Sequence, residues 1–182
     1  NKGLLPEDVG KDKFTGLEKS IYNVYKIYQN KIRELNACDF GDLILYCVKL
    51  FENHPDIRKI YNNNFKYILV DEFQDTNFIQ NKWLNLLVNE QQNICCVGDD
   101  DQSIYSWRGA EIKNFLTFDH IYKNCKVFKL EQNYRSTKNI LETASSLISH
   151  NNGRVEKKLW SSAQLGEKVK LNCYQTGREE AE

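Results

Sequence analysis

The first part of the chain has apolar side chains at helical spacing. Apolar residues step by three or four positions between Leu17 and Leu35, which predicts an amphipathic helix. A second helix is expected to begin at Asp39, because Asp42 follows three residues later and acidic groups in a first turn face the positive end of the helix dipole. Pro55 suits the first turn of a short third helix. The pattern therefore predicts that this part of the chain is helical throughout.

The middle of the chain changes to short apolar runs separated by helix-like segments. The runs are YILV at 67–70, NICCVG at 93–98 and KVFKL at 126–130, and FIQNKWLNLLVN at 78–89 has helical spacing. This β-α-β-α-β order predicts an α/β fold with a parallel sheet that is covered by helices on both faces. Ligands of such sheets bind beyond the carboxyl ends of the strands.

Two more elements are expected near the end of the chain. Thr137 is a candidate N-cap for an amphipathic helix over KNILETASSLISHN at 138–151. The segment KVKLNCYQ at 168–175 alternates between apolar and polar residues, which predicts a half-buried strand.

Composition restricts the classes of partner. The chain has 25 basic and 25 acidic residues, so any site for a polyanion must be local. It has neither an apolar run of about 18 residues nor a secretory signal, so we expect no membrane partner and a cytoplasmic location. The six cysteines lack C-x-x-C spacing and are predicted to be reduced core thiols, and the three histidines are too scattered to suggest zinc. The absence of methionine suggests an excised piece.

The strand at 67–70 runs directly into the acidic residues of VDEFQDTN at 70–77. A strand that ends in Asp71 and Glu72 has the geometry that NTPases use for Mg²⁺. One carboxylate then holds the ion, and its neighbour orients or deprotonates the attacking water. The alternative is that the two acids only begin the next helix.

The next strand leads into VGDDDQSIYSWRGA at 97–110, which presents Gln102, Tyr105, Trp107 and Arg108. Bases stack on exposed aromatic rings, and an arginine can neutralise phosphates or stack beside the bases. The alternative is that the two rings plug the loop onto the domain and Gln102 is an ordinary surface amide.

The third apolar run leads into LEQNYRST at 130–137, with Tyr134 and Arg135 before the capped helix. A ring beside a guanidinium suits adenine stacking and contact with a γ-phosphate. The alternative is a simple helix start with a surface salt bridge.

These three strand ends, in this order, resemble motifs II, III and IV of superfamily 1 DNA helicases, and the closest match is the UvrD/Rep/PcrA type. The resemblance extends to DFGDLI at 39–44 and NNGRVEKKLW at 151–160, so it covers essentially the whole chain. It implies a P-loop NTPase (RecA-like) fold that is preceded by an all-helical insertion. It also implies ATP-dependent 3′–5′ unwinding of duplex DNA in repair or replication, with ATP and Mg²⁺ as cofactors and single-stranded and duplex DNA as partners.

The resemblance also implies roles for residues on the nucleotide side. Asp71 matches the position that holds Mg²⁺, and Glu72 matches the general base for the attacking water. Gln102 matches the residue that senses the γ-phosphate and couples it to the DNA side. Gln74 and Asp75 also match the family pattern and are given only a supporting role.

Further roles concern DNA and the second motor domain. By resemblance, Tyr105 and Trp107 stack on single-stranded bases, and Arg108 links the DNA site to the ATP site. Tyr134 matches the residue that stacks on adenine, and Arg135 matches an arginine finger that reaches the γ-phosphate.

One part of the family pattern does not occur in this sequence, namely a G-x-x-x-x-G-K-[ST] phosphate loop. The chain therefore resembles the middle of a helicase and is expected to be inactive alone. Its expected parts are the end of a helical insertion at 1–65, the second part of the first motor domain at 66–130, and the beginning of the second motor domain at 131–182.

Two other functions remain open from the sequence. Without a phosphate loop, the chain could be a catalytically incompetent nucleic-acid-binding or interaction module derived from a helicase. It could also be a nuclease that uses Asp71, Glu72 and the acidic triplet at 99–101 as a two-metal site. A nuclease would cleave DNA with Mg²⁺ and without ATP.

Overall fold

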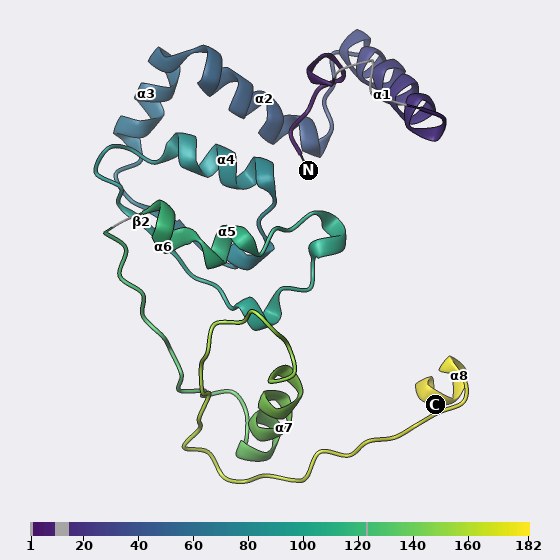
Figure 1. Cartoon of the computed structure of the whole chain (residues 1–182), viewed down its shortest axis with the longest axis vertical. Helices are drawn as coiled ribbons and strands as arrows, with labels where there is room; N and C mark the ends of the chain where they lie inside the picture. The colour runs from purple at the N-terminus through teal and green to yellow at the C-terminus, as the bar shows by residue number, and fades with distance from the viewer. Residues whose placement is uncertain (1, 10–14, 123) are drawn as a thin grey trace. The chain divides into compact units, whose positions relative to one another are not determined.

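The structure is a computed structural model that describes residues 2–9, 15–122 and 124–182 (Figure 1). The chain forms two compact units, Asn1–Cys125 and Lys126–Glu182. The elements of the first unit are, in order, η1 (Pro6–Asp8), α1 (Leu17–Glu34), α2 (Phe40–Asn53), α3 (Pro55–Asn64), β1 (Ile68–Val70), η3 (Phe73–Asp75), α4 (Phe78–Leu87), β2 (Ile94–Cys96), η4 (Asp100–Gln102), η5 (Ser106–Arg108), α5 (Lys113–Leu116) and α6 (Phe118–Ile121). The second unit contains α7 (Lys138–Ile148) and α8 (Gly177–Ala181).

The three helices predicted for the first part of the chain are confirmed as α1, α2 and α3. The start of α2 is a reciprocal cap, in which the Asp42 N–H donates to Asp39 Oδ1 at 2.8 Å and the Asp39 N–H donates to Asp42 Oδ2 at 3.2 Å. The prediction of helix for residues 1 and 10–14 lies outside the described residues. Of the helices in the described ranges, none combines the length and the apolar character needed to cross a membrane.

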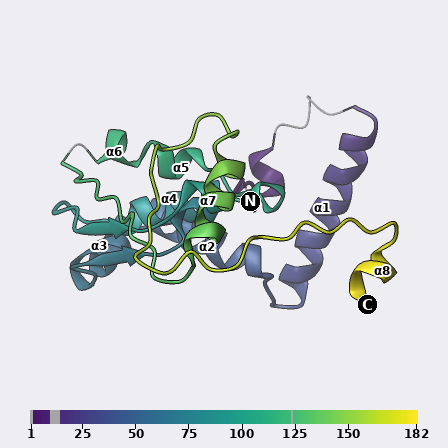
Figure 2. The same ribbon diagram turned by 90° about the horizontal axis from the view of Figure 1, so that it is seen from below.

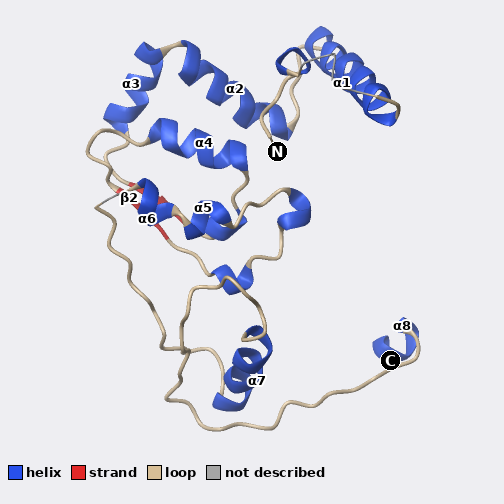
Figure 3. Ribbon diagram, in the orientation of Figure 1, coloured by secondary structure: helices blue, strands red, loops and turns tan. Residues whose placement is uncertain are grey.

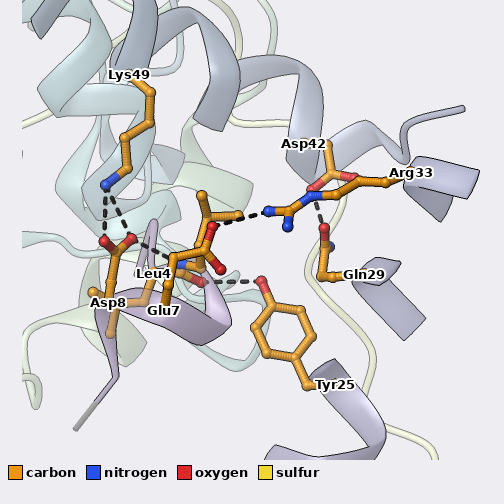
Figure 4. A network of polar contacts seen from close by, with 9 residues as sticks. Leu4, Glu7, Asp8, Tyr25, Gln29, Arg33, Asp42 and Lys49 are labelled. Atoms are coloured by element: carbon orange, nitrogen blue, oxygen red, sulfur yellow. Dashed lines mark hydrogen bonds and ion pairs between the residues drawn. The ribbon is translucent and has the colours of Figure 1, made fainter. Parts of the chain in front are cut away.

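Polar contacts join η1 to α1 and α2 (Figure 4). Lys49 of α2 pairs with Asp8 at 3.0 Å, and Arg33 of α1 pairs with Glu7 at 2.9 Å. The Leu5 N–H, together with the Lys49 ammonium, lowers the pKa of the Asp8 carboxyl because both interactions favour its charged form. These contacts connect η1 to both helices.

The main apolar core of the first unit lies between α2 and α4, which lie side by side with α3 (Figures 1 and 2). Its buried members come from the segment before η1, from α2 and from α4: Leu5, Leu45, Val48 and Ile79. A second, aromatic cluster lies beside the sheet. Its members are Phe73, Phe115, Phe118 and Tyr122.

The sheet of the described residues consists of two short parallel strands, shown in red in Figure 3. Leu69 of β1 pairs with Cys95 of β2, and both are exposed, Leu69 at 79%. Since neighbouring strand residues that pair point to the same face, one face of this sheet is open. The expectation of helices on both faces is therefore not met in the part of the chain that the structure describes.

The two other predicted strands are wrong. Segments 126–130 and 168–175 are irregular, with Phe128 exposed at 80% and Leu171 at 90%. A strand is stabilised by hydrogen bonds to a neighbouring strand, and an apolar or alternating pattern alone does not supply one. In the described ranges neither segment has a strand as its partner.

The prediction for the helix after Thr137 is confirmed by α7. The Thr137 side chain, however, makes no capping hydrogen bond. Before this helix, Gln132 forms an isolated parallel bridge with Trp160, and the Asn133 N–H donates to the Trp160 carbonyl at 2.8 Å. Backbone contacts thus connect the two segments that flank α7.

The cysteines are free, as predicted, but the prediction that they are core thiols is wrong for four of them, Cys38, Cys47, Cys95 and Cys173, which are exposed. The exposure of Cys95 follows from the open face of the sheet. Its neighbour Cys96 points the other way, and burial raises the pKa of that thiol to about 12. Cys96 is therefore protonated at neutral pH.

Candidate functional site

The carboxyl ends of β1 and β2 meet at one edge of the sheet. Beyond the strands, the Val97 N–H donates to the Val70 carbonyl at 2.8 Å, and the Phe73 N–H donates to the Val97 carbonyl at 3.0 Å. These bonds continue the parallel ladder and bring together the two segments that follow the strands. The acidic pair after β1 and Gln102 after β2 therefore belong to the same edge.

Asp71 and Glu72 form a tight, exposed turn directly after β1. The Glu72 N–H donates to Asp71 Oδ1 at 2.9 Å, and Glu72 has left-handed backbone angles, φ 50° and ψ 42°. A non-glycine residue in this conformation costs about 1–2 kcal/mol, and such strain is concentrated at functional sites. The exposed Asp71 carboxylate suits Mg²⁺, which keeps several waters and needs only one or two protein carboxylates.

Gln74 is the buried residue that connects the two segments. Its side chain is 1% exposed, its Nε2 donates to Glu72 Oε2 at 2.7 Å, and its Oε1 accepts from the Asp99 N–H at 3.1 Å. The sequence analysis gave Gln74 only a supporting role. The sequence carries no local signal of this role, since the close approach of Gly98, where a Cβ would lie 2.6 Å from Gln74 Oε1, is visible only in the structure.

Three acidic residues after β2 form a compact group. Carboxylate oxygens of Asp99, Asp100 and Asp101 lie within 4.8 Å of one another, and Asp99 accepts from the Asp101 N–H at 3.0 Å and from Gln102 Nε2 at 2.8 Å. Among the described residues it is the one cluster of metal-ligating side chains, and the acidic pair after β1 is not part of it. The carboxylates that the nuclease hypothesis requires are therefore not assembled in a single cluster.

The loop after η4 presents an exposed cluster of two aromatic rings and an arginine. The Tyr105 and Trp107 ring centroids are 6.4 Å apart, and the Arg108 guanidinium carbon lies 5.5 Å and 5.7 Å from them, respectively. Trp107 is 78% exposed and Tyr105 is 36% exposed. Trp107 therefore does not plug the loop onto this unit, and the cluster has the rings and the cationic group that suit unpaired bases.

The aromatic loop is attached to the segment that follows the acidic turn. The Glu111 N–H donates to the Thr76 carbonyl at 2.9 Å, and Asn114 Nδ2 donates to the same oxygen at 3.2 Å. Asn77 and Ala110 form an isolated antiparallel bridge beside them. These contacts connect the aromatic loop to the segment that follows the acidic turn. No sequence motif predicts them.

Tyr134 and Arg135 belong to the second unit, on a turn that Asn133 holds. Asn133 Oδ1 accepts from the Arg135 N–H at 2.9 Å and from the Ser136 N–H at 2.8 Å. Tyr134 is 84% exposed, and Arg135 is exposed as well. The turn fixes the backbone and leaves both side chains open to solvent.

Carboxylates at strand ends suit the Mg²⁺ of a bound nucleotide, and exposed aromatic rings beside an arginine suit the bases of a single strand. Residues 1–123 match the UvrD/REP helicase N-terminal domain, and residues 128–182 match the UvrD-like helicase C-terminal domain. The chain therefore belongs to the UvrD-like helicase family, as its resemblance to that family predicts.

Several relatives match over the full length of this chain. It is 45% identical over 182 residues to a probable DNA helicase II homolog of Rickettsia felis, and covers 28% of that protein. It is 46% identical over 182 residues to an ATP-dependent DNA helicase PcrA of Staphylococcus epidermidis, and covers 25% of it. The chain thus spans about a quarter of the length of these curated relatives.

Proposed function

We propose that the chain is part of an ATP-dependent 3′–5′ DNA helicase that couples Mg-ATP hydrolysis to the unwinding of duplex DNA in repair or replication. Family membership supports the class of activity. The observation that carries the proposal is the edge of the sheet, where the acidic turn, Gln74 and Gln102 are joined by hydrogen bonds.

In this proposal the first unit binds ATP and promotes its hydrolysis through Asp71, Glu72 and Gln102. Bound Mg²⁺ would neutralise charge on the phosphates of ATP. The Asp71 carboxylate holds that ion, and Glu72 takes the proton of the attacking water. Gln102 contacts the γ-phosphate, and its hydrogen bond to Asp99 links that contact to the rest of the edge.

The aromatic loop is the proposed contact with single-stranded DNA. Tyr105 and Trp107 stack on bases, and Arg108, which lies beside both rings, contributes positive charge near the strand. Because Glu111 and Asn114 attach this loop to the Thr76 carbonyl, a shift of the loop displaces the segment next to the acidic turn.

The second unit supplies the other proposed nucleotide contacts. Tyr134 stacks on the adenine, and Arg135 reaches the γ-phosphate when two motor domains close around ATP. In the complete RecA-like motor, residues 1–65 form the end of a helical insertion. Residues 66–130 belong to the first motor domain, and residues 131–182 begin the second.

The proposal is tested by measuring ATP hydrolysis and DNA binding in two variants of the full-length protein. Glu72→Gln is expected to lower ATP hydrolysis about 10²–10⁴-fold, because a general base contributes that much, while ATP and DNA still bind. Trp107→Ala is expected to weaken single-stranded DNA binding by about 1–3 kcal/mol, which is roughly 5- to 150-fold. Tyr67→Ala, an exposed aromatic outside the loop, is the matched control for DNA binding.

The outcomes separate the candidate functions. Unchanged turnover in Glu72→Gln removes the base assignment, and unchanged DNA affinity in Trp107→Ala removes the stacking assignment. A full-length protein that binds DNA through Trp107 but hydrolyses no ATP would be the catalytically incompetent binding module instead.

A further inference from the structure

Gln74 has the contacts of a residue that orients a catalytic group. Its amide donates to Glu72 Oε2 at 2.7 Å and accepts from the Asp99 N–H at 3.1 Å. We propose that Gln74 is a positioning residue that sets the direction of the Glu72 carboxylate and links it, through Asp99, to Gln102. This inference rests on the proposed function, in which Glu72 is the general base.

The orientation of the amide follows from its partners. The Asp99 backbone N–H can only donate, so the Gln74 oxygen must face it. The NH₂ group then faces Glu72 and donates to its carboxylate oxygen Oε2. A flipped amide would set a donor against a donor and an oxygen against an oxygen, so both contacts favour one orientation.

Close packing keeps the amide in place. Gln74 is 1% exposed, and a Cβ at Gly98 would lie 2.6 Å from Gln74 Oε1 and 2.8 Å from Phe115 Cε2. The backbone of Gly98 therefore approaches the amide closely, as only glycine allows. On the adjacent residue, the Phe73 ring is 1% exposed and packs edge-on against Phe118 with centroids 5.5 Å apart.

The hydrogen bonds continue from Asp99 to the residue that is proposed to contact the γ-phosphate. Asp99 Oδ2 accepts from Gln102 Nε2 at 2.8 Å, whereas the Asp99 backbone N–H donates to Gln74, so Asp99 connects the Glu72–Gln74 pair to Gln102 through its own backbone and side chain. Hydrogen bonds that are linked in this way depend on one another. A γ-phosphate contact at Gln102 can therefore affect the direction of the Glu72 carboxylate.

The test is Gln74→Met in the full-length protein, measured by DNA-stimulated ATP hydrolysis. Methionine keeps the length of the side chain and removes both hydrogen bonds. We expect kcat to fall about 10- to 100-fold, because small displacements of a catalytic group cost this much, with KM for ATP changed less than twofold. If Gln74→Met does not fold, Gln74→Asn, which keeps the amide but is one methylene shorter, takes its place.

A double variant separates positioning from general structural damage. In the Glu72→Gln background, Gln74→Met is expected to cause no further loss of single-turnover rate, because the group that it orients is already gone. Gln80→Met is the matched control: it also removes a side-chain acceptor of a backbone N–H, that of Asn77, but lies in α4 away from this chain of bonds. Its kcat should be unchanged.

Three results would overturn the inference: losses that multiply in the double variant, a rise in KM with unchanged kcat, or full activity in Gln74→Met. Failure of the proposed function looks different, because Glu72→Gln alone would then leave turnover unchanged. In that case Gln74 would have no base to position.

Discussion

The two units present their candidate nucleotide residues in different ways. In the first unit, the Glu72 side chain is bonded to the buried amide of Gln74. In the second unit, Asn133 bonds only the backbone of the turn, and Tyr134 is 84% exposed. The first unit thus holds the side chain of a candidate site residue in place by itself, whereas the second fixes a backbone and leaves its side chains to be ordered by whatever they contact.

The difference extends to the cores. The first unit has an apolar cluster between α2 and α4 and an aromatic cluster around Phe73. In the second unit the buried side chains of the described residues are Leu141 and Ser161. A unit with so little buried apolar surface depends more on backbone and turn hydrogen bonds. Substitutions in the two units should therefore act through different interactions.

The largest effect is expected from Phe73→Ala in the first unit. Phe73 is 1% exposed, and truncating a buried phenylalanine costs about 3–5 kcal/mol through lost burial and the cavity. Urea unfolding with hydrogen exchange should show loss of protection in β1 and β2 and none in α7. Phe78→Ala, at a position 46% exposed, is the control and should cost under about 0.5 kcal/mol. Equal losses of protection in both units would contradict the expectation that the effect of Phe73→Ala stays within the first unit.

A smaller effect is expected from Asn133→Ala in the second unit. The substitution removes the acceptor of two backbone N–H groups, at Arg135 and Ser136. A loss of about 1 kcal/mol corresponds to roughly fivefold faster hydrogen exchange at these two amides. The exposed Asn152 is the control, and Asn152→Ala should leave them unchanged. If Asn133→Ala altered neither amide, the Asn133 side chain would not hold the turn.

Features that depend on neighbouring residues in the sequence were predicted correctly, whereas features that depend on distant residues were not. Helices α1 to α4 and α7 were predictable because apolar spacing and caps such as Asp39 are local signals. The strands expected at 126–130 and 168–175 were not, because a strand requires a partner that its own residues do not specify.

The same division applies to the candidate site. The positions of Asp71 and Gln102 follow from their place after apolar runs that form parallel strands. The proposed role of Gln74 depends on a backbone N–H that lies 25 residues away, at Asp99. No local pattern encodes that contact, so only the structure could reveal it.

The smallest effect concerns the helix caps of the two units and their response to acid. The Asp42 N–H and, to a lesser extent, the Tyr28 hydroxyl favour the charged form of the Asp39 carboxyl and lower its pKa in the folded chain. A carboxyl whose pKa is lowered by folding adds stability at pH values above its unfolded pKa of about 3.9. That contribution is lost as the pH falls through the folded value. Thr137, which precedes α7, has neither a charge nor a capping bond.

Asp39→Asn removes this charge and keeps an oxygen that can accept from the Asp42 N–H, although it replaces the second oxygen, which accepts from the Tyr28 hydroxyl, by an amide nitrogen. Near pH 7 we expect the variant to be less stable by about 0.3–1 kcal/mol, the usual value of a negative charge at a helix N-terminus. The difference should shrink toward zero in urea titrations as the pH falls below about 4, while protection of α7 stays the same in both proteins. Glu34→Gln controls for the loss of one negative charge, since Glu34 is in an exposed pair with Lys31. A difference that persisted undiminished at the lowest pH would show that Asp39 stabilises α2 by its shape and hydrogen bonds and not by its charge.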